Sequence, residues 1–165
     1  MQLYLIRHGI ATEPQTDTND TEKILTEKGR QKTRQIAKQM WEKEVLFDII
    51  LTSPLIRARE TAAILKDIGL SSQVEEFASL SPDGDISTWI NWLEEWRQNT
   101  TIKGNLALVG HQPDLGNWAE TLVWGEAKEK LVLKKAGVIG LTLPETGTPI
   151  GESQLFLLTS PKWLV

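Results

Sequence analysis

The sequence predicts an α/β fold in which helices pack on a mainly parallel β-sheet. Three short apolar runs, at residues 2–6, 47–51 and 105–109, each end abruptly at polar residues and precede a segment with helical spacing of its apolar side chains. Two β-rich runs follow near the end of the chain. Strands and helices that alternate in this way are typical of an α/β sandwich, in which ligands bind beyond the carboxyl ends of the strands.

The elements are predicted in order from their periodicity and their boundary residues. In the first half they are a strand at 2–6, an exposed polar loop at 9–22, a helix from Thr26 as N-cap to about Glu44, a strand at 47–51, and a helix with Pro54 in its first turn that ends near Asp67. In the second half they are a strand at 72–77, a turn at 81–85, a helix at 86–98, a strand at 105–109, a helix at 115–124, and strands at 137–143 and 154–159.

Composition narrows the possible classes of protein. A chain of 165 residues with 40% hydrophobic residues suits one domain over residues 1–165. The net charge of −4 gives no broad basic surface for nucleic acid, and no apolar run approaches the length of a membrane span. With no cysteine and no apparent signal peptide, the protein is expected to be cytoplasmic. The seven tryptophans are interpreted as packing residues.

Three predicted strand ends carry side chains suited to a phosphoryl group. Arg7 and His8 follow the first strand, Arg57 lies one turn into the helix after the second, and His111 follows the fourth. Parallel strands bring such ends to one edge of a sheet, so we expect these side chains to converge. The planar guanidinium groups of the arginines can stabilise the negative charge of a transferring phosphoryl group. A neutral His8 can attack phosphorus, and a protonated His111 can donate a hydrogen bond to the transferring group.

Other routes to hydrolysis fit the sequence less well. Two histidines and no cysteine leave few ligands for a zinc or two-metal centre, and there is no compact acidic cluster. The G-x-x-x-x-G-K-[ST] and G-x-S-x-G motifs are absent. We therefore expect neither a metal nor another cofactor.

Three blocks, Leu5–Gly9, Ser53–Ala62 and Val109–Pro113, occur in the order typical of one family. The chain resembles the histidine phosphatase superfamily, the phosphoglycerate-mutase-like proteins, and within it the short branch that contains bacterial phosphohistidine phosphatases. The resemblance implies a three-layer sandwich whose six-stranded sheet has one antiparallel strand. It also implies that His8 is the nucleophile, that Arg7 and Arg57 bind phosphate, and that His111 completes the pocket. Lys23 and Gly9 are further candidates for phosphate binding.

Larger members of the family carry a glutamate that protonates the leaving oxygen, in a segment that is short here. Glu76 and Asp83 are the nearest candidates for that proton donor, although the sequence favours interpreting each as an ordinary solvated loop or strand-end carboxylate. Without inserted segments the site is expected to be open, and the acid-bearing segment is missing. Both features favour phosphohistidine on a phosphotransfer signalling protein as the substrate, because imidazole can leave already protonated. Two alternatives remain: a phosphatase or mutase for small phosphoesters, and an inactive phosphate-binding scaffold domain.

Several neighbouring residues are given structural interpretations. Arg59 is expected to pair with Glu60 on its helix, while Ser53 and Thr61 are expected to bond local backbone. Gly110, beside His111, is expected to permit a close backbone approach.

Overall fold

One mixed sheet forms the centre of this computed structural model, which describes residues 1–13, 19–100 and 104–164. Within those ranges the strands are β1 (Gln2–Arg7), β2 (Ile49–Thr52), β3 (Val74–Glu76), β4 (Leu106–Gly110), β5 (Val138–Thr142) and β6 (Gln154–Thr159). They lie in the order β3-β2-β4-β1-β5-β6. The pairs β3–β2, β2–β4 and β4–β1 are parallel, whereas β5 is antiparallel to both of its neighbours. The predicted sheet, with six strands and one of them antiparallel, is confirmed.

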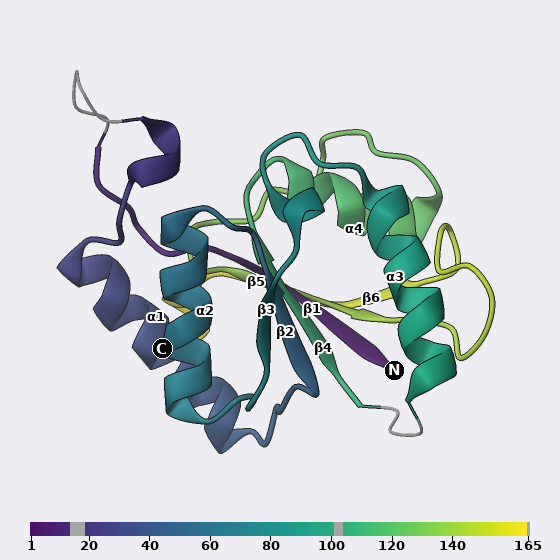
Figure 1. The fold of residues 1–165 in the computed structure, drawn as a ribbon, viewed down its shortest axis with the longest axis horizontal. Helices are drawn as coiled ribbons and strands as arrows, with labels where there is room; N and C mark the ends of the chain where they lie inside the picture. The colour runs from purple at the N-terminus through teal and green to yellow at the C-terminus, as the bar shows by residue number, and fades with distance from the viewer. Residues whose placement is uncertain (14–18, 101–103, 165) are drawn as a thin grey trace.

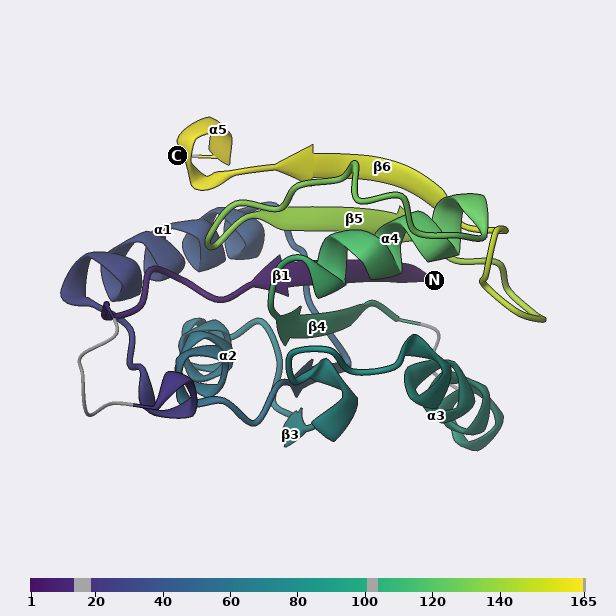
Figure 2. The same ribbon diagram turned by 90° about the horizontal axis from the view of Figure 1, so that it is seen from above.

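Helices cover both faces of the sheet (Figure 1). The described helices are α1 (Glu27–Glu42), α2 (Ile56–Ile68), α3 (Ile86–Asn99), α4 (Asp114–Trp124) and the short α5 (Pro161–Leu164), with 3₁₀ turns η1 (Asp20–Glu22) and η2 (Ala78–Leu80). In Figure 1, α1 and α2 lie on one side of the sheet and α3 and α4 on the other. Seen from above, β3 and β6 are the two edge strands, and α5 follows β6 (Figure 2). This arrangement is the three-layer sandwich that was expected.

Alternating side chains of the central strands fill two separate cores. On β1, Leu3 and Leu5 point into the core shared with α3 and α4, while Tyr4 and Ile6 point into the core shared with α1 and α2. The period of two residues along a strand sends successive side chains to opposite faces. Since both faces of β1 are covered by helices, its sequence is a continuous apolar run.

Local signals start and stop the helices. The Thr26 hydroxyl accepts a hydrogen bond from the Gly29 N–H at 2.9 Å and caps α1. Asp85 caps α3 by accepting from the Ser87 N–H at 2.9 Å. Gly69, with φ of +105°, ends α2 in the left-handed conformation that glycine adopts without a Cβ penalty. These caps fix where α1 and α3 begin and where α2 ends.

Some sequence predictions need correction. Helix α1 ends at Glu42 rather than near Glu44, which has a left-handed φ of +59°. Helix α2 begins at Ile56, so Pro54 lies before its first turn. Strand β3 spans only Val74–Glu76, and the turns η1 and η2 and helix α5 were not predicted, because such short elements carry too few residues for a periodic pattern.

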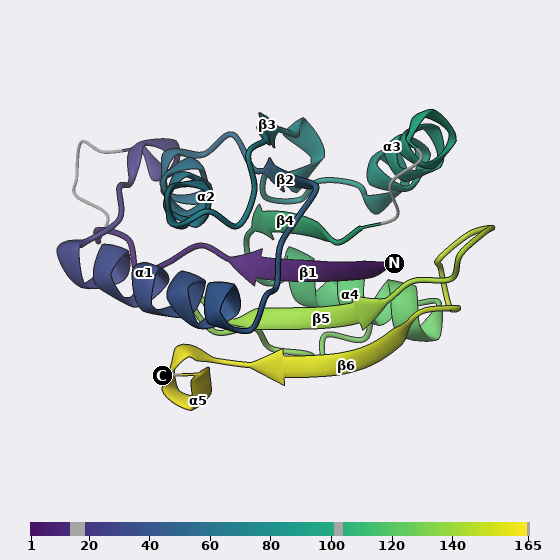
Figure 3. The same cartoon turned by 90° about the horizontal axis from the view of Figure 1, so that it is seen from below.

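The tryptophans divide between core and surface. Trp89 and Trp118 are buried between the sheet and helices α3 and α4. Trp41, Trp124 and Trp163 are each more than half exposed, so the interpretation of all seven as packing residues was wrong for these three. Trp163 lies on α5, which packs beside α1 (Figure 3). No helix in the described ranges is long and apolar enough to cross a bilayer.

Candidate active site

The carboxyl ends of β1, β2 and β4 meet at one edge of the sheet. Their parallel register places Arg7 opposite Gly110 and Thr52 opposite Val109, so the residues that follow each strand emerge side by side. The imidazole rings of His8 and His111 are 5.2 Å apart between centroids. The structure therefore brings together strand ends that are about fifty residues apart in the sequence.

A hollow of about 370 Å³ opens at this edge of the sheet. It is lined by residues from segments far apart in the sequence: Arg7, His8, Ala11, Thr12, Glu13, Asp20, Lys23, Arg57, Pro82, Asp83, His111, Gln112, Pro113, Asp114 and Lys135. The four side chains that the sequence indicated for phosphoryl chemistry all line it, and so do Lys23 and Asp83. Below, this hollow is called the phosphate pocket.

His8 is held in one orientation by two hydrogen bonds. Its Nδ1 lies 2.7 Å from the Gly9 carbonyl oxygen, which can only accept, so Nδ1 carries the proton. Its Nε2 lies 3.3 Å from Nε of Arg57, which can only donate, so Nε2 offers a lone pair. The residue is 6% exposed, and its burial, together with the positive charges of Arg57 and Arg7, lowers the pKa of His8 to about 3. His8 is therefore a neutral imidazole whose unprotonated nitrogen, Nε2, faces Arg57.

Arg57 connects His8 to an acidic side chain that the sequence analysis missed. Its Nη1 donates to the backbone oxygen of Asp20 at 2.7 Å, and its Nη2 lies 3.2 Å from the Asp20 carboxylate. The same carboxylate is 3.0 Å from Nζ of Lys23, and these cations keep the pKa of Asp20 below its usual value, Lys23 contributing most. Asp20 thus presents an anion to two cations that the sequence indicated for phosphate. It lies in a polar loop without periodicity, so no local pattern marked it.

Arg7 is anchored at one end of its guanidinium group. Nη1 donates to the Leu133 carbonyl oxygen at 3.0 Å, while Nε is buried and has no hydrogen-bond partner among the described residues. Burial and then the charge of Arg57 lower the pKa of Arg7. The guanidinium groups of Arg7 and Arg57 repel each other, and Arg7 Nε has no acceptor among the described residues, so an oxyanion bound between them would be stabilised.

His111 contacts a serine through one nitrogen and leaves the other unpaired. Its Nε2 lies 2.8 Å from Oγ of Ser53, and its buried Nδ1 has no partner among the described residues. Burial, followed by the charge of Arg57, lowers the pKa of His111 to about 4. His111 is therefore neutral at pH 7, whereas the sequence analysis considered it as a protonated donor. Ser53 makes the expected local bond, from the Leu55 N–H at 3.2 Å, but its contact with His111 was missed.

Gly9 supports His8 rather than lining the phosphate pocket. Its N–H donates to the Thr61 hydroxyl at 3.1 Å, and its carbonyl oxygen accepts from His8, so neither group is free for a ligand. A Cβ at Gly9 would lie 2.6 Å from Oγ1 of Thr33, which explains why glycine is needed there. At Gly110 a Cβ would meet only Leu115 and other atoms at 3.4 Å or more, so the predicted close approach occurs at Gly9 instead.

The two candidate proton donors occupy different places. Glu76 is absent from the lining of the phosphate pocket and pairs with Arg59 at 3.6 Å. Arg59 therefore does not pair with Glu60, which instead binds Arg30 at 2.7 Å. Asp83 lines the pocket from an exposed turn.

Asp114 is a further pocket carboxylate that the sequence analysis did not single out. Its Oδ2 accepts from the Asp83 N–H at 2.8 Å, and burial raises its pKa. It is the first residue of α4, directly after the block that contains His111, and that position was the available signal.

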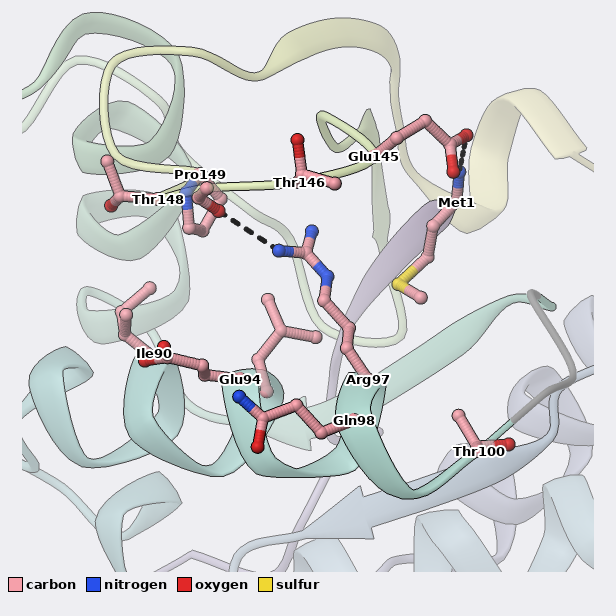
Figure 4. Close-up of a pocket in the computed structure, with 12 residues that line it drawn as sticks. Met1, Ile90, Glu94, Arg97, Gln98, Thr100, Glu145, Thr146, Thr148 and Pro149 are labelled. Atoms are coloured by element: carbon pink, nitrogen blue, oxygen red, sulfur yellow. Dashed lines mark hydrogen bonds and ion pairs between the residues drawn. The ribbon is translucent and has the colours of Figure 1, made fainter.

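A second hollow, of about 460 Å³, lies at the opposite end of the sheet beside Met1 and α3 (Figure 4). There Arg97 donates to the carbonyl oxygens of Pro144 and Gly147 at 2.7 and 3.0 Å and fastens the loop before β6. The hollow contains neither histidine. Among the described residues, no group of three or more histidine, aspartate or glutamate side chains is arranged to hold a metal ion.

Comparison with known proteins connects this geometry to a family. The sequence profile of the histidine phosphatase superfamily (branch 1) matches residues 3–80, which include Arg7, His8 and Arg57. An uncharacterized protein of Picosynechococcus is 43% identical over 100% of this chain and 99% of its own length. The phosphohistidine phosphatase SixA of Escherichia coli is 27% identical over 89% of this chain and 88% of its own.

Solved structures agree with the sequence relatives. The structure of the protein histidine phosphatase SixA complexed with tungstate covers 100% of both chains with a TM-score of 0.85 at 25% identity. The α-ribazole phosphatase of Shigella flexneri shares the fold, with a TM-score of 0.72 at 17% identity over 98% of this chain and 97% of its own. These likenesses support phosphatase activity, and the chain belongs to the histidine phosphatase superfamily.

Proposed function

We propose that this protein hydrolyses phosphohistidine on phosphotransfer proteins through a covalent phospho-His8 intermediate. The observation that carries the proposal is the state of His8: a neutral ring whose Nδ1 is bound to the Gly9 carbonyl and whose Nε2 lone pair faces Arg57 in the phosphate pocket. A nucleophile needs an unprotonated nitrogen at neutral pH, and Nε2 is unprotonated; its lone pair accepts the hydrogen bond from Nε of Arg57, which has to be given up when Nε2 attacks.

In the first step His8 Nε2 attacks the phosphorus atom of the substrate. The P–Nε2 bond forms as the P–N bond of the substrate's phosphohistidine breaks, and that imidazole leaves as a neutral ring if its other nitrogen already carries a proton. Arg7 and Arg57 stabilise the negative charge on the phosphoryl oxygens. The Gly9 carbonyl, 2.7 Å from Nδ1, stabilises the positive charge that the phosphorylated His8 ring acquires.

In the second step water replaces His8 at phosphorus. The water oxygen bonds to phosphorus, the P–Nε2 bond breaks, and the water's protons end on the phosphate product and in solvent. The electron pair of the broken bond returns to Nε2, so His8 regains its starting state. Before phosphate binds, Arg57 must release the Asp20 carboxylate, since both anions compete for the same guanidinium.

Three observations support a protein-bound phosphohistidine as substrate. Lys23 and Lys135 line the pocket together with both arginines and with the carboxylates of Glu13, Asp20, Asp83 and Asp114, and these cations can bind an anionic phosphoryl group. Glu76, a candidate for the family's glutamate acid, lies outside the pocket lining and pairs with Arg59. A substrate whose leaving group is imidazole needs such an acid least. The E. coli relative is named a phosphohistidine phosphatase, and the SixA structure holds tungstate, a tetrahedral oxyanion like phosphate.

One observation favours hydrolysis of small phosphoesters as a second candidate function. Asp114 lines the phosphate pocket and has a raised pKa, so its carboxyl group can be protonated more readily than an ordinary aspartate. A protonated carboxyl group beside the pocket can supply the proton that an alkoxide leaving group requires. The scaffold alternative is disfavoured because both histidines and both arginines are present in the pocket.

The decisive experiment compares substrates and traps the intermediate. Wild-type protein is given a phosphohistidine-bearing carrier protein, a phosphoserine peptide and a set of phosphosugars, each with and without chelator. We expect the carrier protein to be hydrolysed fastest, with no effect of chelator, and an acid-labile phosphoryl group to appear on the enzyme during turnover. Faster hydrolysis of the esters would reverse the order of the two candidates.

Two variants test the nucleophile. His8→Ala should abolish turnover and the trapped phosphoryl group. Arg59→Ala is the matched control, because Arg59 is on α2 like Arg57 but pairs with Glu76 outside the pocket lining, and it should retain turnover. Full activity of the His8→Ala protein would disprove the covalent mechanism.

A further inference from the structure

Ser53 is a buried hydroxyl that joins the end of β2 to His111. The residue has no exposed surface, and its backbone N–H donates to the Val109 carbonyl oxygen on β4 at 2.9 Å. Its Oγ has two polar neighbours: the Leu55 N–H at 3.2 Å and His111 Nε2 at 2.8 Å. The backbone hydrogen bond fixes the position of Ser53, and the two side-chain contacts determine in which direction its hydroxyl donates.

Counting protons settles which atom donates in the pair. A serine hydroxyl has one proton and two lone pairs. The Leu55 N–H is a donor and occupies one lone pair, so the hydroxyl proton needs an acceptor. Among the described residues, the acceptor in reach of Oγ is His111 Nε2. A buried hydroxyl proton left without an acceptor is costly, so Ser53 donates and Nε2 accepts.

The second nitrogen of His111 then has a fixed role. A neutral imidazole carries one N–H, and if Nε2 accepts, the proton is on Nδ1. Nδ1 is the buried atom that has no partner among the described residues, while the ring lines the phosphate pocket beside His8 and Arg57. The opposite tautomer would leave the serine proton unsatisfied and place a lone pair, in place of an N–H, on the unpartnered nitrogen of the ring.

We propose that Ser53 is a positioning residue that holds His111 as its Nδ1–H tautomer and so provides an N–H donor for the phosphoryl group. His111 thereby contributes a hydrogen bond without adding a charge beside Arg7 and Arg57, which already repel each other's positive charge. The tautomer is a property of the free protein, and its catalytic consequence rests on the proposed function.

Nitrogen-15 NMR of the imidazoles tests the tautomer directly. The chain has only two histidines, so long-range ¹H–¹⁵N spectra contain only two imidazole patterns, and His8→Ala assigns them. In phosphate-free buffer at pH 7 we expect His111 Nδ1 to have the chemical shift of a protonated ring nitrogen and Nε2 that of an unprotonated one. The reverse pattern in wild-type protein would overturn the proposal without any variant being needed.

Variants of Ser53 test the catalytic consequence. Ser53→Ala should shift the His111 pattern toward a mixture of tautomers and reduce kcat about tenfold with little change in KM, less than the roughly 10²-fold to 10³-fold loss typical of deleting a donor outright. Ser53→Thr keeps the hydroxyl and should restore the wild-type spectrum and rate. Ser71→Ala removes another buried hydroxyl, which bonds the backbone of Gln73, and should leave both unchanged.

The possible outcomes separate the two proposals. If Ser53→Ala keeps the wild-type His111 spectrum, Ser53 does not set the tautomer. If it changes the spectrum but not kcat, the positioning role fails. A wild-type protein that shows the expected spectrum but does not hydrolyse phosphohistidine refutes the proposed function and leaves the tautomer in place. Urea unfolding of each variant identifies any that fails to fold, and Ser53→Thr and the wild-type spectrum then still decide.

Discussion

Acidification from pH 7 to pH 5 should destabilise this protein, because its two buried imidazoles resist protonation. Burial lowers the pKa of His8 to about 3 and that of His111 to about 4, against 6.5 for an unperturbed histidine. Below pH 6.5 both histidines of the unfolded chain therefore bind protons, whereas those of the folded chain stay unprotonated until the pH is much lower. The stability due to neutral imidazoles is complete above about pH 6.5 and is lost as the pH falls toward the two folded pKa values.

The size of the effect follows from the same linkage. At pH 5 each unfolded histidine gains about 2 kcal/mol by binding its proton, compared with about 0.2 kcal/mol at pH 7. Two such groups lower the free energy of unfolding by about 4 kcal/mol between these pH values, which is a large part of the 5–15 kcal/mol typical of a domain. Most carboxylates titrate below this window, so the histidines dominate the change.

Urea unfolding at pH 7, 6 and 5 in phosphate-free buffer measures this loss. His8→Gln and His111→Gln each remove one titrating ring, so each should reduce the loss between pH 7 and 5 by about 2 kcal/mol, and the double variant should show almost none. Arg59→Gln, outside the pocket, should behave as the wild type. Equal pH slopes for all of these proteins, or an NMR titration of His8 near pH 6.5, would refute the argument.

Three further perturbations follow from the structure. Asp20→Asn removes a carboxylate that competes for Arg57 and should tighten phosphate or tungstate binding about fivefold, from roughly 1 kcal/mol of relieved repulsion; unchanged or weaker binding by calorimetry would contradict this. Trp89→Ala leaves a cavity at a fully buried position and should lower the free energy of unfolding, measured with urea, by about 3–5 kcal/mol; a decrease below about 1 kcal/mol would contradict this. Gly9→Ala places a Cβ 2.6 Å from Oγ1 of Thr33 and should cost about 1–3 kcal/mol, relieved in part by adding Thr33→Ala; a single variant as stable as wild type would show that the backbone moves freely.

The positions of the four main pocket residues follow from the sequence by one physical rule. Each apolar run that ends at Arg7, Thr52 or Gly110 is a strand, and neighbouring parallel strands expose their carboxyl ends at one edge of the sheet. Once the strands are recognised, His8, Arg57 and His111 must lie near one another. The antiparallel strand β5 was expected only from the family resemblance, since its apolar pattern is compatible with either direction.

The contacts that set the charge and proton positions in the pocket were decided by the tertiary structure. Ser53 and His111 are 58 positions apart, Arg57 and Asp20 are 37, and Asp83 and Asp114 are 31. Periodicity and capping describe interactions within a few residues, so they locate strands and helices but not which side chain on one loop meets a group on another. The sequence by itself determined that histidines and arginines gather at one sheet edge. Only the packing of the loops determined which nitrogen of each histidine carries the proton and which carboxylate occupies Arg57, because burial and hydrogen-bond partners exist only in the folded chain.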